Sequence, residues 1–212
     1  DFVFHLAGIN RPQDPAEFSS GNTGLTQALC QALADAGLRV PVVFASSSQA
    51  AQDDAYGQSK RAAEDALFAL QRSHGLPVHV FRLPNVFGKW AKPNYNSAIA
   101  TFCHNIARGL PIQINNPDAP LTLVYVDDVV QRFVQLLDGA DACVDGEGFA
   151  TISPQYSSTV GTVAAQIQAF KDSRCSRMSE RVGTGLVRAL YATYVSYLRP
   201  ESFAYSVPQH AD

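Results

Sequence analysis

The sequence predicts an α/β domain that is doubly wound around a parallel sheet, with a small C-terminal portion beyond about residue 140. Short apolar runs alternate along the chain with longer amphipathic runs, which is the pattern of strands and crossover helices. The runs that follow one another are separated by a dozen or more residues, as parallel strands require. Glycine and proline stand at several of the boundaries, for example at Gly37, Pro41 and Gly75.

Each predicted strand is a short apolar run. The first ends at Ala7-Gly8, where the backbone can approach a ligand closely. The second begins at Pro41, a position where a missing N–H is tolerated. The predicted strands are residues 2–6, 40–45, 78–83, 121–126 and 149–153.

The predicted helices carry an apolar face or begin and end with typical signals. Leu25, Leu29 and Leu33 recur every four residues, and Gly37 ends that helix. Asp127 and Asp128 place carboxylates in the first turn of another. The predicted helices are residues 22–36, 55–73, 96–108, 127–137, 159–171 and 184–198.

The composition is that of an ordinary soluble globular protein, with 46% hydrophobic and 17% charged residues. A net charge of -3 gives no basic field, so we expect neither nucleic acid nor an anionic membrane surface as a partner. No apolar run approaches the roughly 18 to 20 residues of a membrane span. The four cysteines are scattered without zinc spacing, which favours free thiols in a reducing cytoplasm and no metal. We interpret His5, His79 and His104 as structural.

Tyr56 and Lys60 stand four residues apart on one predicted helix face. A free tyrosine titrates near 10, and a nearby ammonium group would favour its phenolate form. Such a pair can exchange a proton with a carbonyl or hydroxyl group as a hydride moves. The spacing alone occurs often by chance and is a weak indication.

Three serines, Ser46, Ser47 and Ser48, follow the second predicted strand. Ligands of open α/β sheets bind at the carboxyl ends of strands, so a serine hydroxyl there could hold a reacting oxygen in line with Tyr56. Without Tyr56 and Lys60, a strand-ending turn would be the better interpretation of these serines.

These residues resemble the extended short-chain dehydrogenase/reductase family, the NAD-dependent epimerase/dehydratase group. The matching segments stand in the family's order and cover residues 2 to about 137. They are Phe4-His5-Leu6-Ala7-Gly8, Asn22, residues 43–48, Tyr56-Gly57-Gln58-Ser59-Lys60, Arg82-Leu83-Pro84-Asn85-Val86-Phe87-Gly88 and residues 124–129.

The resemblance implies a Rossmann-like domain at residues 1–139, truncated at its N-terminus, and a substrate-binding portion at 140–212. It implies Ser47, Tyr56 and Lys60 as catalytic residues, with Ser48 as the alternative serine and Lys60 lowering the pKa of Tyr56. The implied cofactor is NADP or NAD, held by Ala7, Gly8, Asn22, Ser46, Tyr56, Lys60, Pro84 and Val86. The implied substrate-binding residues are Arg11, Ser48, Asn85, Lys89, Lys92 and Asn94, with residues 84–97 adding contacts to the substrate.

A narrower resemblance is to the CapF/WbjC type of bifunctional enzymes. It rests on Gly8-Ile9-Asn10-Arg11-Pro12, residues 84–97 and the tyrosines Tyr191, Tyr194 and Tyr197. The resemblance implies reduction of the C4 keto group of a UDP-2-acetamido-2,6-dideoxy-hexos-4-ulose, in N-acetyl-L-fucosamine precursor synthesis for capsule or O-antigen. It also implies a longer parent protein with a C-terminal cupin domain, and a cytoplasmic location. A homodimer paired through helices 22–36 and 55–73 is expected by analogy.

The loop after residue 88 has features that suit a nucleotide sugar independently of the resemblance. Lys89, Trp90 and Lys92 combine two cations with an aromatic ring, which suits a uracil ring and a diphosphate. A solvated loop with a locally packed Trp90 is the alternative. Arg11 is expected to pair with phosphate in the same way, and a position facing water is the alternative.

Two features missing from the sequence limit the activities that we expect. The resemblance implies that a 4,6-dehydratase of this group would carry an acidic pair after its catalytic hydroxyl residue. Gln49-Ala50 stands there instead, so we expect no dehydration. Reduction or a redox-neutral UDP-sugar epimerisation remains, and a non-catalytic binding protein of the same fold is the third hypothesis. The 212 residues contain no glycine-rich turn after a strand to hold a pyrophosphate, so we expect them alone to bind cofactor weakly or not at all.

Overall fold

The computed structural model describes residues 1–204, which form two compact units. Unit 1 comprises Asp1–Pro84 and Asp128–Pro154, and unit 2 comprises Asn85–Asp127 and the chain from Gln155 onward. This division follows compactness, so residues 85–127 fall with the C-terminal part of the chain. The assignment of cofactor and substrate roles to residues 1–139 and 140–212 stays a prediction.

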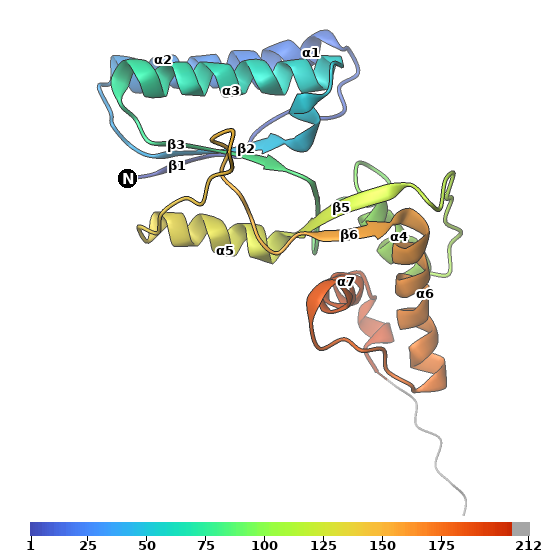
Figure 1. The fold of residues 1–212 in the computed structure, drawn as a ribbon. Helices are drawn as coiled ribbons and strands as arrows, with labels where there is room; N and C mark the ends of the chain where they lie inside the picture. The colour runs from blue at the N-terminus through green and yellow to red at the C-terminus, as the bar shows by residue number, and fades with distance from the viewer. Residues whose placement is uncertain (205–212) are drawn as a thin grey trace, which may run out of the picture. The chain divides into compact units, whose positions relative to one another are not determined.

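Unit 1 is built on a parallel sheet with strand order β1-β2-β3. Helices α2 and α3 cover one face of this sheet, and α5 lies on the other (Figure 1). The doubly wound arrangement expected from the sequence is therefore present. The strands are β1 (Val3–His5), β2 (Val42–Ser47) and β3 (Val78–Leu83), and the helices are α1 (Ala16–Phe18), α2 (Leu25–Asp35), α3 (Ala55–His74) and α5 (Val126–Leu137).

The strand side chains of unit 1 alternate between the two helical layers. Phe44 and Val80 are register partners on β2 and β3, and both pack in one buried cluster with Leu67 of α3. Phe81 points the other way and meets Phe133 of α5, with 5.2 Å between ring centroids. The period of two along each strand thus builds a core on both faces of the sheet.

Helix α3 has well-defined ends. Asp54 accepts a hydrogen bond from the backbone N–H of Gly57 at 2.7 Å, which caps the N-terminus. Gly75 ends the helix in the left-handed conformation with φ 68°, a backbone shape that glycine adopts without strain. These caps fix where α3 starts relative to the strand before it.

The helix expected over residues 22–36 begins differently. Residues Ser19–Gly24 form a π-helical turn, η1, and the regular helix α2 starts at Leu25. The wider turn buries the side chain of Asn22, which is 3% exposed. Such turns are often found at functional sites.

Unit 2 combines a mixed sheet with three helices. Strand β4 pairs parallel with β5, and β6 pairs antiparallel with β5. The elements are β4 (Asn85–Phe87), β5 (Pro120–Tyr125), β6 (Tyr156–Thr159), α4 (Ala98–Ala107), α6 (Val160–Ser176), α7 (Gly185–Ser196) and the short 3-10 turn η3 (Pro200–Ser202).

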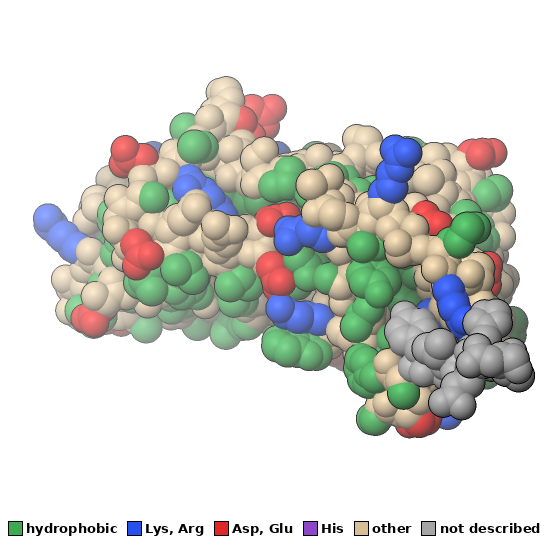
Figure 2. Space-filling model, turned by 90° about the horizontal axis from the view of Figure 1, so that it is seen from below, with side chains coloured by type: hydrophobic (Ala, Val, Ile, Leu, Met, Phe, Trp, Pro, Cys, Tyr) green, Lys and Arg blue, Asp and Glu red, His purple; other side chains and the backbone are tan. Residues whose placement is uncertain are grey.

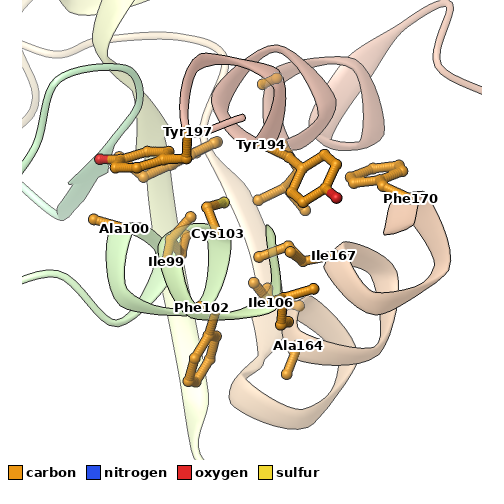
Figure 3. Close-up of a cluster of buried hydrophobic side chains, with 14 of the residues drawn as sticks. Ile99, Ala100, Phe102, Cys103, Ile106, Ala164, Ile167, Phe170, Tyr194 and Tyr197 are labelled. Carbon is orange, nitrogen blue, oxygen red and sulfur yellow. The ribbon is translucent and has the colours of Figure 1, made fainter. Parts of the chain in front are cut away.

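The core of unit 2 lies between its helices. Cys103 of α4 and Ile167 of α6 are fully buried, and Tyr194 of α7 packs beside them (Figure 3). The rings of Phe170 and Tyr194 lie 6.0 Å apart between centroids. Burial of this apolar surface is the main stabilising contribution in unit 2.

One expected strand was wrong: residues 149–153 form no strand, having only an isolated bridge between Val144 and Ala150. β6, which was not among the expected strands, runs antiparallel to β5. Phe149 instead joins the core of unit 1, and the backbone N–H of Ala150 donates to the carbonyl of Val80 at 2.8 Å. The apolar character of that segment therefore reflects burial without strand pairing.

Charged side chains of both signs are scattered over the face shown in Figure 2, with hydrophobic side chains between them. Helix α5 contributes exposed apolar side chains of its own, Val130, Val134 and Leu137. Within residues 1–204, no helix is both long and apolar enough to cross a membrane. The same residues contain no group of three or more His, Cys, Asp or Glu side chains that could hold a metal ion.

Candidate active site

The three serines at and just after the end of β2 lie in three different environments. Ser46 is buried and its hydroxyl donates to the carboxylate of Glu64 at 2.5 Å. Ser47 accepts from the backbone N–H of Gln49 at 3.2 Å, and its side chain is near enough to Tyr56 to lower the pKa of that phenol. Ser48 is exposed. Ser47 is therefore the serine that the structure brings to Tyr56.

Tyr56 lies in the first turn of α3 and is half-buried. Its ring packs against Phe18, with 5.5 Å between centroids. Burial raises the pKa of Tyr56, the hydrogen bond from Ser47 lowers it in part, and the carboxylate of Asp54 raises it further. The net direction is upward, so Tyr56 holds its proton at neutral pH.

Lys60 lies one turn further along α3 and is only 5% exposed. Its ammonium group donates to the carbonyl of Ala45 at 2.9 Å and lies 4.5 Å from the ring centroid of Phe44. Burial lowers the pKa of Lys60 to about 8, although the nearby Glu64 carboxylate raises it.

The expected effect of Lys60 on Tyr56 is not present in this structure. We expected the ammonium group to lower the pKa of Tyr56, and that pKa is raised. The physical reason is that burial raises the pKa of Tyr56, while the ammonium group of Lys60 donates its hydrogen bond to the carbonyl of Ala45.

Asn22 ties the loop after β1 to the helix that carries Tyr56. Its amide oxygen accepts from the N–H of Ile9 at 2.8 Å, and its amide nitrogen donates to the carbonyl of Ile9 and to the hydroxyl of Ser59, each at 3.0 Å. Ser59 in turn donates to the carbonyl of Tyr56 at 2.7 Å. These bonds fix the end of β1 against the first turn of α3.

Gly8 lies within this arrangement with its backbone exposed. A Cβ atom at Gly8 would come within 2.9 Å of the Asn22 amide oxygen and 3.6 Å of the Lys60 nitrogen. The position therefore requires glycine, and it leaves the backbone open to close approach by a ligand. Ala7 beside it is also exposed.

His5 extends the buried polar network below Lys60. Its Nε2 lies 2.8 Å from the hydroxyl of Thr26, which itself donates to the carbonyl of Asn22. Because that hydroxyl proton is committed, His5 donates through Nε2. Burial and then the charge of Lys60 lower the pKa of His5, in keeping with the structural role expected for it.

The remaining expected residues lie in loops and short strands. In unit 1, Arg11 is exposed and Pro84 is half-buried directly after β3. In unit 2, Val86 is 37% exposed on β4, and Asn85 donates to the carbonyl of Thr122 at 3.1 Å. Their roles stay predictions.

The loop of residues 88–94, between β4 and α4, is held firmly within unit 2. Lys89 pairs with Asp127 at 2.9 Å, and the carbonyl of Ala91 accepts from the hydroxyl of Tyr197 at 2.5 Å. Trp90 and Asn94 both have positive φ, at 66° and 53°, a conformation that costs free energy for residues other than glycine. The loop therefore presents Trp90, which is 86% exposed, from a fixed backbone.

Lys92 and Asn94 occupy the far part of this loop. The ammonium group of Lys92 lies 5.3 Å from the ring centroid of Tyr95. The backbone N–H of Asn94 donates to the hydroxyl of Thr101 at 2.9 Å. Both side chains are exposed, as the expected contact with a substrate requires.

Sequence reasoning did not assign a role to Glu64, which is 1% exposed. The signal was its spacing, four residues after Lys60 on the same helix face. Its partner Arg82 stood within a family segment but received no role of its own. Burial of the carboxylate could not be seen in the sequence.

A separate hollow of about 360 Å³ lies within unit 2, between the end of α6 and α7. It is lined in part by the rings of Phe170 and Tyr191 and by the polar side chains of Arg177 and Glu180. None of the expected site residues lines it, so it is not the candidate active site.

The serine at the carboxyl end of β2, together with the tyrosine and lysine of α3, is the set expected of the epimerase/dehydratase family. The comparisons with known proteins agree. The chain belongs to the NAD dependent epimerase/dehydratase family, whose model matches residues 1–150. The α/β fold with a parallel, Rossmann-like sheet is thereby confirmed.

Particular relatives are more informative. The chain is 54% identical over all 212 residues to the UDP-2-acetamido-2,6-beta-L-arabino-hexul-4-ose reductase of Pseudomonas aeruginosa, covering 56% of that protein. It is 38% identical to the solved structure of the capsular polysaccharide assembling protein CapF from Staphylococcus aureus, with a TM-score of 0.90 over 100% of this chain and 57% of that one. The chain thus spans a little over half the length of these relatives.

A more distant structure shares the fold alone. The UDP-glucuronic acid 4-epimerase from Bacillus cereus, solved in complex with NAD, is 17% identical, with a TM-score of 0.75. The match covers 93% of this chain and 74% of that one.

Proposed function

We propose that this chain is the reductase part of an enzyme that reduces the C4 keto group of a UDP-2-acetamido-2,6-dideoxy-hexos-4-ulose. NADPH is the proposed reductant, and the product is a precursor for capsule or O-antigen. The observation that carries the proposal is the contact between Ser47 and Tyr56 at the end of β2, with Lys60 buried one turn away. The 54% identity to a protein named as such a reductase supports the choice of substrate.

Tyr56 is the proposed proton donor to the C4 oxygen. Reduction of a ketone needs an acid at that oxygen, and the raised pKa of Tyr56 keeps the proton on the phenol at neutral pH. Ser47, which lowers the pKa of Tyr56, is proposed to hold the same oxygen. Lys60 is the proposed cation that stabilises the phenolate after the proton has left.

The residues around Gly8 fit a nicotinamide dinucleotide. The exposed backbone at Ala7 and Gly8 permits close approach, and Lys60 supplies a buried cation next to Gly8. Ala7, Gly8, Asn22, Ser46 and Lys60 would hold the cofactor, with Tyr56, Pro84 and Val86 completing the set. When bound, the nicotinamide supplies the hydride that reaches C4 of the sugar.

The loop of residues 88–94 is proposed to bind the UDP group. Trp90 offers an exposed aromatic face. Lys89, which is paired with Asp127, lies 5.3 Å from the Trp90 ring centroid, and the exposed Lys92 lies 5.3 Å from the ring centroid of Tyr95. An aromatic ring suits the uracil, and ammonium groups suit the diphosphate. Asn85, Asn94, Arg11 and Ser48 are proposed to contact the rest of the substrate.

The proposal extends to the parent protein. The relatives are longer than this chain, and a C-terminal cupin domain and a homodimer are proposed for the intact enzyme. A cytoplasmic location is proposed because Cys30, Cys103, Cys143 and Cys175 are all free thiols.

The test is the stoichiometry of cofactor consumption by the intact protein. Adding the 4-keto sugar to enzyme and excess NADPH should remove one equivalent of NADPH absorbance for each equivalent of sugar. Conversion of the sugar without loss of absorbance would instead support the redox-neutral epimerase. The absence of any conversion, with the sugar bound, would support a non-catalytic binding protein.

A further inference from the structure

Glu64 is a buried carboxylate within a set of short hydrogen bonds. It accepts from the hydroxyl of Ser46 at 2.5 Å and from Arg82, through Nε at 3.1 and 3.2 Å and through Nη2 at 2.7 Å. The carboxylate is 2% exposed, and the Arg82 side chain is 23% exposed. Both carboxylate oxygens are therefore paired, which a buried charge requires.

The partners of Glu64 stand side by side in the sheet. Ser46 on β2 and Arg82 on β3 are register partners, so Glu64 ties α3 to two strands at one level of the sheet. Arg82 has two further contacts. Its guanidinium lies 3.8 Å from the ring centroid of Phe149 and 3.7 Å from the carboxylate of Glu147.

Three successive residues of β2 each meet a residue of α3. The carbonyl of Ala45 accepts from Lys60, the hydroxyl of Ser46 donates to Glu64, and the side chain of Ser47 acts on the pKa of Tyr56. The three helix residues stand at intervals of four, on one face of α3. The Glu64 bonds therefore fix the rotation and the axial position of the helix that carries both proposed catalytic residues.

A buried ion pair is rarely the most stable solution for a core position. Hydrophobic residues of similar volume often stabilise a fold as well or better. The polar set here also places a negative charge one helical turn from the buried ammonium group of Lys60. Titratable groups on the elements around Lys60 include His5 on β1, Tyr56, Arg61, Glu64 and Asp65 on α3, and His79 and Arg82 on β3. Among them, Glu64 is the group whose charge raises the pKa of Lys60.

We propose that Glu64 is a positioning residue for the reduction: its bonds to Ser46 and Arg82 lock α3 onto β2, and its charge keeps Lys60 an ammonium group beside Tyr56. This inference rests on the proposed function for the role of Lys60. The direction of the Lys60 pKa agrees with it, since Glu64 raises that pKa against the effect of burial.

The test compares three variants of the intact protein. Glu64→Gln removes the charge and nearly keeps the shape, and Glu64→Asp keeps the charge but shortens its reach. Leu67→Ala is the matched control, because Leu67 is a fully buried residue of the same helix that is not part of the polar set. All three should unfold at lower denaturant concentration, so stability alone cannot distinguish them.

The deciding readout is the titration of Lys60, followed by NMR of lysine labelled at Cε and assigned by the signal lost in Lys60→Met. Glu64→Gln should move the Lys60 midpoint about one pH unit lower. The high-pH limb of kcat/KM, which reports the loss of the Lys60 charge, should move with it. Glu64→Asp should lower kcat with the midpoint near its original value, and Leu67→Ala should leave the midpoint unchanged.

An unchanged Lys60 midpoint in Glu64→Gln, or an equal change in Leu67→Ala, would overturn the inference. If Glu64→Gln does not fold, Glu64→Asp decides, since a kcat equal to that of the original protein would overturn the positioning role. The NMR titration needs no sugar substrate. A failure of the proposed reduction would therefore be seen separately from a failure of the coupling between Glu64 and Lys60.

Discussion

The two units of the chain differ most in what they bury. Within residues 1–204, eight polar or charged side chains are buried, and seven of them belong to unit 1: His5, Asn22, Thr26, Ser46, Ser59, Lys60 and Glu64. The eighth, Thr193 in unit 2, donates to the carbonyl of Ala189 in its own helix. Unit 2 otherwise has an apolar core, which includes the buried rings of Tyr194 and Tyr197.

The buried polar groups of unit 1 are best explained by a functional site, whereas the core of unit 2 is explained by apolar packing alone. A buried polar group costs free energy unless it is hydrogen-bonded, and an apolar side chain would serve the fold equally well. The polar groups of unit 1 lie around the ends of β1 and β2, beside Tyr56 and Lys60. Unit 2 presents its polar features on an exposed loop, where desolvation costs little.

The largest stability effect expected in this comparison concerns the core of unit 2. Ile167 is fully buried, so Ile167→Ala should lower the free energy of unfolding by about 2–5 kcal/mol. Denaturant unfolding of the intact protein checks the loss. Because Ile167 touches no proposed catalytic residue, kcat of the folded fraction should stay within about twofold, a change of less than 0.5 kcal/mol. A fall in kcat with unchanged stability would contradict the separation of the two regions.

Lys60 should have the opposite effect on stability. The difference between a pKa of 10.5 in the unfolded chain and about 8 in the folded chain corresponds to about 3 kcal/mol of destabilisation at neutral pH. Replacing the lysine also loses one hydrogen bond, worth about 1 kcal/mol. Lys60→Met should therefore stabilise the protein at pH 7 by about 1–2 kcal/mol while abolishing the proposed activity.

The stability gained by Lys60→Met should depend on pH in a definite direction. Because the folded pKa lies below the unfolded one, the unfolded chain binds the extra proton between pH 8 and 10.5, and the lysine protein gains stability as pH rises. The advantage of Lys60→Met should thus shrink between pH 7 and 10. The half-buried thiol of Cys30 and the buried thiol of Cys103 have raised pKa values and act in the opposite direction, but they are common to both proteins. Lys92→Met, at an exposed lysine, is the control and should show no such trend.

How much of this could be predicted from the sequence depends on the type of signal. The bounds of α3 follow from Asp54 and Gly75, and the serines at the end of β2 follow from an apolar run that stops, because both are local signals. β6 was missed because Tyr156–Thr159 is short and polar, with no alternation to mark a strand. β4 was missed because Pro84 separates it by one residue from β3, and a proline interrupts the hydrogen-bond ladder.

The part of the site that is marked by local sequence signals was predicted, and the rest was not. Ser47, Tyr56 and Lys60 were named from a pattern along the chain, and the structure brings Ser47 to Tyr56. The ion pair between Glu64 and Arg82 joins residues 18 positions apart, and the raised pKa of Tyr56 depends on burial. Neither is encoded in local spacing.

A smaller effect is expected where the helices of unit 2 hold the loop of residues 88–94. Tyr197→Phe removes the hydrogen bond to the carbonyl of Ala91 and should cost about 1 kcal/mol. A thermal or denaturant unfolding curve measures it. Tyr191→Phe should be neutral, because the ring contact with Phe170 is kept. Equal losses in both variants would show that the hydrogen bond does not matter.

The smallest stability effect is expected at Trp90. The side chain is 86% exposed, so Trp90→Ala should change the free energy of unfolding by less than about 0.5 kcal/mol. If the indole stacks on the uracil, KM for the UDP-sugar should rise about tenfold, within the range for base stacking on an aromatic ring. Leu110→Ala, at another exposed apolar residue of unit 2, is the control. An unchanged KM would remove Trp90 from the proposed site.

The most direct test of the central claim is a single-turnover measurement on the intact protein with the 4-keto sugar and NADPH deuterated at the nicotinamide C4. We expect deuterium to arrive at C4 of the sugar, and Tyr56→Phe to slow this transfer by about 10²–10⁴-fold with an unchanged unfolding curve. Tyr191→Phe, a matched tyrosine in unit 2, should transfer at the original rate. Transfer by Tyr56→Phe at the original rate would contradict the assignment of Tyr56 as the proton donor.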